Sequence, residues 1–165
     1  EYHIVYALKL SQPGAVKDLL ASITSLAKNV EEPERYVVHV LCDEESQVAM
    51  EEMASCYRGQ LGSPPQAPRL EVQLLHQLPP VMVDYMSRMD TSTGSYLPKV
   101  ADASLSRLYL EEYVPAKSKR VLWLDPDTIV AADLGPLFRS NMTYGAGFAV
   151  DSDFDLQKDF LHFMP

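Results

Sequence analysis

Short, continuous apolar runs alternate along this chain with stretches in which apolar residues recur at helical spacing. Runs at 3–8, 36–42, 121–124 and 144–150 consist almost entirely of apolar residues, and the run at 70–75 is mostly apolar. Short apolar runs bounded by polar or turn-forming residues are typical of buried β-strands. The pattern therefore predicts five strands.

Between these runs, apolar residues recur every three or four positions over 16–30, which predicts an amphipathic helix. Ser11 followed by Pro13 predicts the start of that helix. Two more helices are expected over 44–57 and 100–113. Alternating strands and helices favour a parallel sheet with helical crossovers. The expected fold class is a three-layer α/β/α sandwich with a mostly parallel sheet.

The length of 165 residues and the hydrophobic content of 47% suit one compact domain with a sizeable core. No apolar run approaches the roughly 20 residues needed to cross a bilayer. The chain begins within a predicted strand, without a signal-peptide pattern, and stops abruptly at Pro165. We therefore expect residues 1–165 to form a single incomplete domain, truncated at the carboxyl end of a longer protein.

The formal net charge of −9 argues against a nucleic-acid partner, because nucleic-acid phosphates require a basic surface. A ligand that carries phosphate is still compatible with this charge if a metal ion or a few local cations offset the repulsion.

The cysteines and histidines show no spacing typical of a metal site. Cys42 and Cys56 are too few for a disulfide framework, and both are expected to be buried free thiols. His3, His39 and His76 are expected to serve packing, in the core or at the surface.

The strongest chemical signal is a pair of acids after a predicted strand. In open α/β sheets, ligands bind beyond the carboxyl ends of the strands. Asp125 and Asp127 follow the predicted strand at 121–124, and Asp151 follows the last predicted strand. Two carboxylates one residue apart can face one Mg²⁺ or Mn²⁺ ion, which prefers oxygen ligands. Pro126 between them stiffens the backbone.

A solvated acidic turn is the alternative interpretation. Against it, the pair lies directly after an apolar strand, and the apolar Ile129 and Val130 follow. Two buried acids without a partner would be strongly destabilising through desolvation and repulsion. At this point both interpretations stay open.

The block from 104 to 138 helps to decide between a metal-binding acid pair and a solvated acidic turn. It combines an Arg-Leu-x-Leu segment that begins at Arg107, a strand led by lysine and arginine that runs into Asp-x-Asp, and an Asp-Leu-x-x-Leu-Phe segment that ends at Phe138. This order and spacing resemble the family 8 glycosyltransferases. The strand at 3–7, the helix after it and the strand at 36–42 occur in the matching order, so the resemblance covers nearly the whole chain.

The resemblance implies a GT-A fold and a retaining transfer of a hexosyl or uronosyl group from a UDP-sugar to a glycan or protein acceptor. It implies Mn²⁺ or Mg²⁺ as the metal, which would stabilise the charge on the departing nucleoside diphosphate. It also implies the Golgi lumen for a eukaryotic protein, anchored as a type II membrane protein, and the cytoplasm for a bacterial one. The residues that match the family's donor site are Asp125 and Asp127 for the metal, Arg107 and Pro126 beside the donor, Ala7, Leu8 and Lys9 around the nucleoside, and Asp151 at the sugar hydroxyls.

Three features depart from the family pattern. The acceptor-binding half is missing, which leaves open that this piece alone binds a donor weakly and is inactive. Lys9 occupies a loop where the family often has acidic or amide residues. The family's His-x-x-Gly-x-x-Lys-Pro segment, which supplies a third metal ligand, is absent, and His162 does not match it. Arg107 also has a plain structural interpretation, an ion pair with Glu111 four residues later.

Two other functions stay open on sequence grounds. A strand ending in Asp-x-Asp-x-Thr is also typical of haloacid-dehalogenase-like phosphatases, in which Asp125 would be the nucleophile, Asp127 the acid/base and Mg²⁺ the cofactor. That motif normally opens its domain, whereas several strand–helix segments precede it here. The third possibility is a non-catalytic domain that binds a nucleotide or a partner protein.

Overall fold

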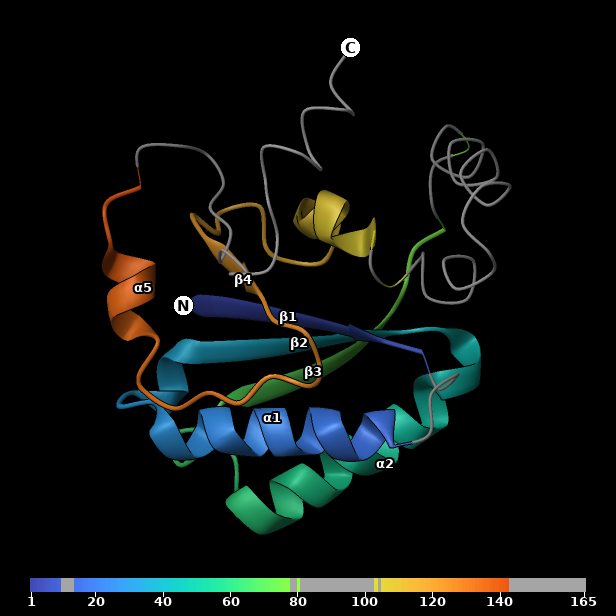
Figure 1. Cartoon of the computed structure of the whole chain (residues 1–165), viewed down its shortest axis with the longest axis horizontal. Helices are drawn as coiled ribbons and strands as arrows, with labels where there is room; N and C mark the ends of the chain where they lie inside the picture. The colour runs from blue at the N-terminus through green and yellow to red at the C-terminus, as the bar shows by residue number, and fades with distance from the viewer. Residues whose placement is uncertain (10–13, 78–79, 81–102, 104, 143–165) are drawn as a thin grey trace, which may run out of the picture.

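The computed structural model describes residues 1–9, 14–77, 80, 103 and 105–142, which include a four-stranded parallel sheet. The strand order is β3-β2-β1-β4, so β1 lies in the interior of the sheet and β4 lies beside it (Figure 1). The strands are β1 (Tyr2–Leu8), β2 (Tyr36–Cys42), β3 (Arg69–Leu74) and β4 (Val121–Trp123).

Helices cover both faces of this sheet. On one face lie α1 (Ala15–Asn29) and α2 (Glu44–Leu61), and on the other lies the 3₁₀ segment η2 (Ser106–Glu112) (Figure 1). Two short elements complete the described part, η1 (Pro33–Arg35) and α5 (Gly135–Arg139). The predicted three-layer α/β fold with a parallel sheet is confirmed.

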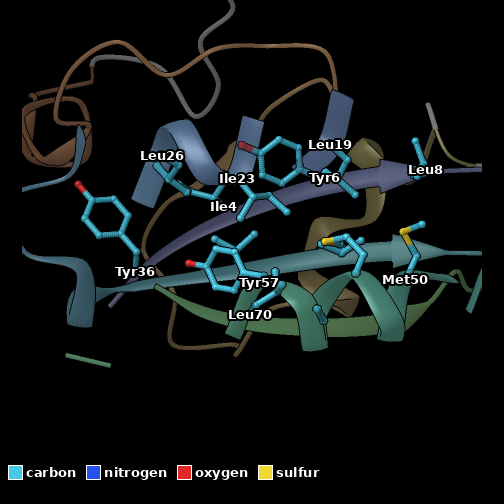
Figure 2. Close-up of a cluster of buried hydrophobic side chains, with 14 of the residues drawn as sticks. Ile4, Tyr6, Leu8, Leu19, Ile23, Leu26, Tyr36, Met50, Tyr57 and Leu70 are labelled. Atoms are coloured by element: carbon cyan, nitrogen blue, oxygen red, sulfur yellow. The ribbon is translucent and has the colours of Figure 1, made fainter. Parts of the chain in front are cut away.

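The core explains why β1 reads as a continuous apolar run. Ile4, Tyr6 and Leu8 face α1 and α2 (Figure 2). Val5 and Ala7 belong to a second cluster on the opposite face. All seven residues of β1 are buried. Each fully buried large aliphatic side chain stabilises the fold by about 1.5–3 kcal/mol. From α1, the completely buried side chains in this core are Leu19, Ile23 and Leu26.

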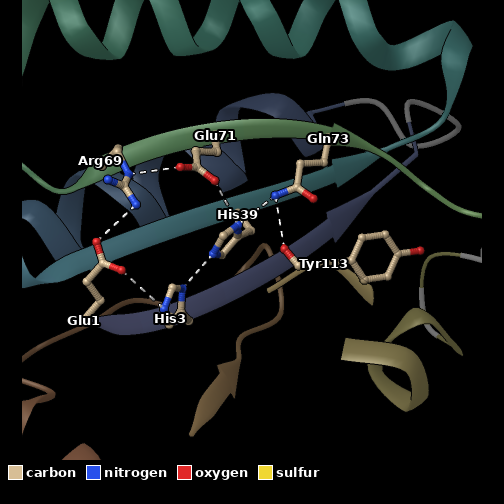
Figure 3. A network of polar contacts seen from close by, with 7 residues as sticks. All are labelled: Glu1, His3, His39, Arg69, Glu71, Gln73 and Tyr113. Atoms are coloured by element: carbon tan, nitrogen blue, oxygen red, sulfur yellow. Dashed lines mark hydrogen bonds and ion pairs between the residues drawn. The ribbon is translucent and has the colours of Figure 1, made fainter. Parts of the chain in front are cut away.

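A polar network crosses the sheet on the face opposite α1 (Figure 3). His3 Nδ1 lies 3.0 Å from His39 Nε2, and both rings are almost completely buried. Gln73 Nε2 lies 2.8 Å from His39 Nδ1 and donates to the carbonyl oxygen of Tyr113. Because an amide nitrogen only donates, His39 Nδ1 accepts and its Nε2–H donates to His3. Glu71 Oε2 lies 3.4 Å from His39 Nδ1.

Burial lowers the pKa of His39 to about 4, and it also lowers the pKa of His3. Both rings are therefore neutral at pH 7. The prediction that these two histidines serve packing is confirmed, and His76 lies exposed at the surface beside Glu112.

Two helix predictions need correction. The helix predicted from Ser11 begins instead at Ala15, after Gly14, which has a φ of 91° that favours glycine; residues 11 and 13 lie outside the described part. Of the α-helix expected at 100–113, residues 103 and 105 are α-helical, but 106–112 are 3₁₀ with a non-helical Tyr109, and residues 100–102 and 104 lie outside the described part. Ser106 donates to the carbonyl of Ala103 at 2.6 Å, a local bond that competes with α-helical pairing.

Other boundaries moved less. The second helix continues to Leu61, because Gly62 with a φ of 86° ends it. Cys42 and Cys56 are both free thiols as predicted, but only Cys42 is buried, since Cys56 lies on the outer face of α2. The predicted strand at 144–150 lies outside the described residues. Within the described part, no helix is both long and apolar enough to cross a membrane.

Candidate functional site

The predicted acid pair follows β4 directly, at the carboxyl edge of the sheet. β4 pairs with β1 in parallel, with Trp123 opposite Val5. The amide of Leu124 then donates to the carbonyl of Val5 at 3.0 Å, which extends the pairing by one residue. Asp125 therefore leaves the sheet beside the last residues of β1.

A tight turn holds the acid pair. The amide of Thr128 donates to the carbonyl oxygen of Asp125 at 3.1 Å, and the Thr128 hydroxyl donates to the same oxygen at 2.8 Å. Pro126 and Asp127 occupy the two central positions, and proline's fixed φ suits the first of them. The backbone between the two carboxylates is thus restrained at both ends.

Hydroxyl groups connect this turn to the core. Thr128 Oγ1 lies 3.2 Å from Ser22 Oγ on α1, and Ser22 Oγ lies 3.0 Å from the Tyr6 hydroxyl on β1. Since Thr128 donates to Asp125, the chain of donors runs from Tyr6 through Ser22 to Thr128. Burial raises the pKa of Tyr6 to about 12, so its hydroxyl keeps its proton at neutral pH.

Two further side chains of α1 hold the segment after the turn. The amide of Val130 donates to Ser25 Oγ at 2.9 Å, and Asn29 Nδ2 donates to the carbonyl of Val130 at 2.9 Å. Sequence reasoning missed these anchors. The signal for them was a row of polar residues, Ser22, Ser25 and Asn29, at three- and four-residue spacing beside the apolar stripe of the helix.

One argument made from the sequence is wrong. Asp125 and Asp127 are exposed, and Ile129 is 68% exposed. The residues of β4 are only half-buried, because no described strand pairs with its outer side. The expected cost of burying two acids therefore does not arise, and burial gives no reason to infer a bound cation.

Trp123 connects two of the predicted site residues. Its indole Nε1 donates to Asp125 Oδ1 at 3.1 Å, and the guanidinium carbon of Arg107 lies 5.7 Å from the centre of its ring. Trp123 thus contacts both Arg107, on η2, and the first acid of the pair. Sequence reasoning missed Trp123. A tryptophan within an apolar strand gives no sign that its indole N–H donates to a neighbouring carboxylate.

The remaining predicted residues differ in what they present. Ala7 and Leu8 are buried residues, only 7% and 6% exposed, so they offer a ligand little accessible surface. Lys9 follows directly and is half-buried. Asp151 lies outside the described residues, so its predicted contact stays a prediction.

The acid pair fits a hard divalent cation in its chemistry. Exposed carboxylates supply the oxygen ligands that Mn²⁺ and Mg²⁺ prefer, and Mg²⁺ commonly takes one or two carboxylates with phosphate oxygens and water. Among the described residues, no group of three or more His, Cys, Asp or Glu is placed to hold a metal ion. A metal here would bind to Asp125 and Asp127. Its other ligands would be water and the phosphate oxygens of a bound ligand.

The opposite edge of the sheet contains a cavity of about 630 Å³. It holds none of the predicted site residues, so it does not alter the assignment of the site to the carboxyl edge. Its lining comes from the amino end of β1, the segment before β4 and one residue of α5: Glu1, Tyr2, His3, Lys117, Ser118, Lys119, Arg120 and Phe138.

Two solved structures with a similar fold are glycosyltransferases. The apo crystal structure of mouse xyloside xylosyltransferase 1 is similar with a TM-score of 0.55 and 15% identity, over 83% of this chain and 47% of that one. The apo structure of WbbM, a bifunctional glycosyltransferase, is similar with a TM-score of 0.54 and 16% identity, over 86% of this chain and 21% of that one. The fold is therefore the GT-A fold, and this chain spans less than half the length of either structure.

A comparison with family models identifies the family of this chain. The model of glycosyl transferase family 8 matches residues 3–163, so this chain belongs to that family. No curated protein sequence matches the chain. Membership confirms the resemblance seen in the block from 104 to 138 and favours glycosyl transfer over the phosphatase alternative.

Proposed function

We propose that this chain forms the donor-binding part of a retaining glycosyltransferase. It binds a UDP-sugar, from which a hexosyl or uronosyl group is transferred to a glycan or protein acceptor. The observation that carries the proposal is the restrained Asp125-Pro126-Asp127 turn at the carboxyl edge of the sheet, in a chain of glycosyl transferase family 8.

Asp125 and Asp127 hold the metal ion, which when bound stabilises the negative charge on the departing nucleoside diphosphate. Arg107 adds a permanent positive charge that approaches the acid pair through Trp123. These charges matter because the whole chain carries a net charge of −9, which by itself repels a diphosphate.

The nucleoside lies against the end of β1. Ala7 and Leu8 form the buried floor of this part of the site, and the half-buried Lys9 lies at its rim. Asp151 orients the donor sugar through its hydroxyl groups. The metal and the phosphates thus bind at the turn after β4, and the nucleoside binds at the end of β1. These two strands are neighbours in the sheet.

Calorimetric titration with UDP, in the presence and absence of Mn²⁺, tests the proposal. We expect binding that requires Mn²⁺ and weakens at least tenfold in Asp125→Asn and in Asp127→Asn, because each loses a charged oxygen ligand. Glu52→Gln is the matched control, since Glu52 is an exposed acid on α2. UDP affinity equal in all four proteins would overturn the site. Metal-dependent UDP binding without transfer to any acceptor would support the non-catalytic alternative.

A further inference from the structure

Trp123 is the single tryptophan of the chain and the last residue of β4. Its ring packs beside the smaller apolar cluster, on the face of the sheet opposite α1. Its indole N–H nevertheless reaches the surface and donates to Asp125 Oδ1 at 3.1 Å. One side chain thus joins the packed sheet to an exposed carboxylate. The buried members of that cluster are Val5, Ala7, Leu41, Ala103 and Tyr113.

This hydrogen bond restricts the Asp125 carboxylate. An exposed aspartate samples several rotamers, and ordering it on metal binding costs entropy. The indole donor selects the rotamer in which Oδ1 faces Trp123. Within the described part of the chain, Oδ2 makes no hydrogen bond, so it is available to a cation.

The face of the same ring has a second role. The Arg107 guanidinium lies 5.7 Å from the ring centre, within the roughly 6 Å over which an aromatic ring attracts a cation. Arg107 is exposed on η2, and Asp125 is exposed after β4. Trp123 is therefore the contact shared by the predicted phosphate-binding cation and the first predicted metal ligand.

We propose that Trp123 is a positioning residue of the donor site, whose N–H orients Asp125 toward the metal and whose ring face holds Arg107 toward the phosphates. The inference rests on the proposed function and extends it to a residue with no direct contact to the ligand. Hydrogen bonds that orient metal ligands typically alter metal affinity 10- to 100-fold. Because Asp125 is exposed, we expect the lower end of that range.

Two substitutions separate the two roles. Trp123→Phe keeps an aromatic face for Arg107 and removes the donor, so Mn²⁺ should bind about tenfold more weakly in the presence of UDP. Trp123→Leu removes both, so affinity for UDP should fall further. Tyr113→Phe is the matched control, because it removes a hydroxyl of the same cluster that pairs with the His76 amide and not with Asp125. Thermal unfolding of each protein checks that the variants are folded.

The single tryptophan also provides a readout of metal binding beside Asp125. Mn²⁺ is paramagnetic and quenches nearby fluorophores, so saturation with Mn²⁺ and UDP should quench the Trp123 emission. Asp125→Asn should shift the emission of the metal-free protein, since it changes the group that accepts from the indole.

The outcomes distinguish this inference from the proposed function. Wild-type protein that binds Mn²⁺ and UDP while Trp123→Phe binds them equally well would overturn the positioning role and leave the proposed function intact. Wild-type protein that binds neither would overturn both. A tenfold loss in Trp123→Phe, unchanged affinity in Tyr113→Phe and quenched emission in the wild type would support the positioning role.

Discussion

At the scale of single residues, the turn that carries the acid pair depends on side chains that themselves carry no charge. Ser22 is completely buried and stands between the Tyr6 and Thr128 hydroxyls. Removal of one member of such a chain leaves a buried donor or acceptor without a partner, which costs more than the lost bond. The position of Asp125 thus depends on a serine of α1, which lies far from it in the chain.

We expect Ser22→Ala to lower the free energy of unfolding by about 1–3 kcal/mol, because the buried Tyr6 hydroxyl loses its partner. Urea denaturation measures this change. Thr24→Ala on the same helix is the control and should have little effect. Adding Tyr6→Phe to Ser22→Ala should restore part of the loss, since no unpaired hydroxyl then remains. A double variant less stable by the sum of both single effects would contradict this account.

At the scale of elements, β1 and β2 form the centre of the described sheet, and their only buried ionisable side chains on the face opposite α1 are the two paired histidines, His3 and His39. Around them lie Glu1, Arg69 and Glu71, which come from β1's start and from β3 (Figure 3). The pair is satisfied only when both rings are neutral, with one N–H between them. Protonation would place a positive charge between strands.

This arrangement predicts a pH dependence of stability. The pKa of His39 is about 4 in the folded chain and about 6.5 when unfolded, so the unfolded state binds more protons between these values. Stability is therefore full above pH 6.5 and falls as the pH drops toward 4, by on the order of 3 kcal/mol. Glu71 lies close enough to the ring to offset part of this loss.

Chemical denaturation from pH 7 to about pH 5.5 measures the slope, above most of the range in which carboxylates titrate. His39→Gln should flatten it, because glutamine does not titrate. His76→Gln, which removes an exposed histidine paired with Glu112, should leave it unchanged. A wild-type slope equal to that of His39→Gln would show that the buried pair does not control stability in this range.

At the scale of the whole molecule, the sequence predicted the layers well and the site unevenly. The strand at 36–42 has the predicted bounds because both of its faces are covered, which makes the apolar run continuous. The segment at 100–113 misled because its apolar spacing resembles a helix, whereas Leu108 is 57% exposed and Ser106 bonds locally. The periodicity of a sequence shows the spacing of its apolar residues, but it does not show local hydrogen bonds such as the one made by Ser106.

The candidate site, too, was predicted only in part from the sequence. The acid pair and Arg107 were predicted from their motif, and in the structure Trp123 contacts both Arg107 and Asp125. The exposure of the acid pair was not predicted. It follows from the strand order, which leaves one side of β4 unpaired in the described sheet, and strand order depends on long-range pairing. The Trp123 contact was also out of reach, since it depends on the pairing of β4 with β1 and on one side-chain rotamer.

The central claim is that Asp125 and Asp127 hold a divalent ion against the diphosphate of the donor. A crystal structure of the chain with Mn²⁺ and UDP tests it most directly, because the anomalous scattering of manganese locates the ion independently of the protein atoms. We predict a manganese peak within about 2.0–2.4 Å of carboxylate oxygens from both residues and of the UDP phosphates. A manganese peak elsewhere, with both carboxylates turned away from the ion and the nucleotide, would contradict the account.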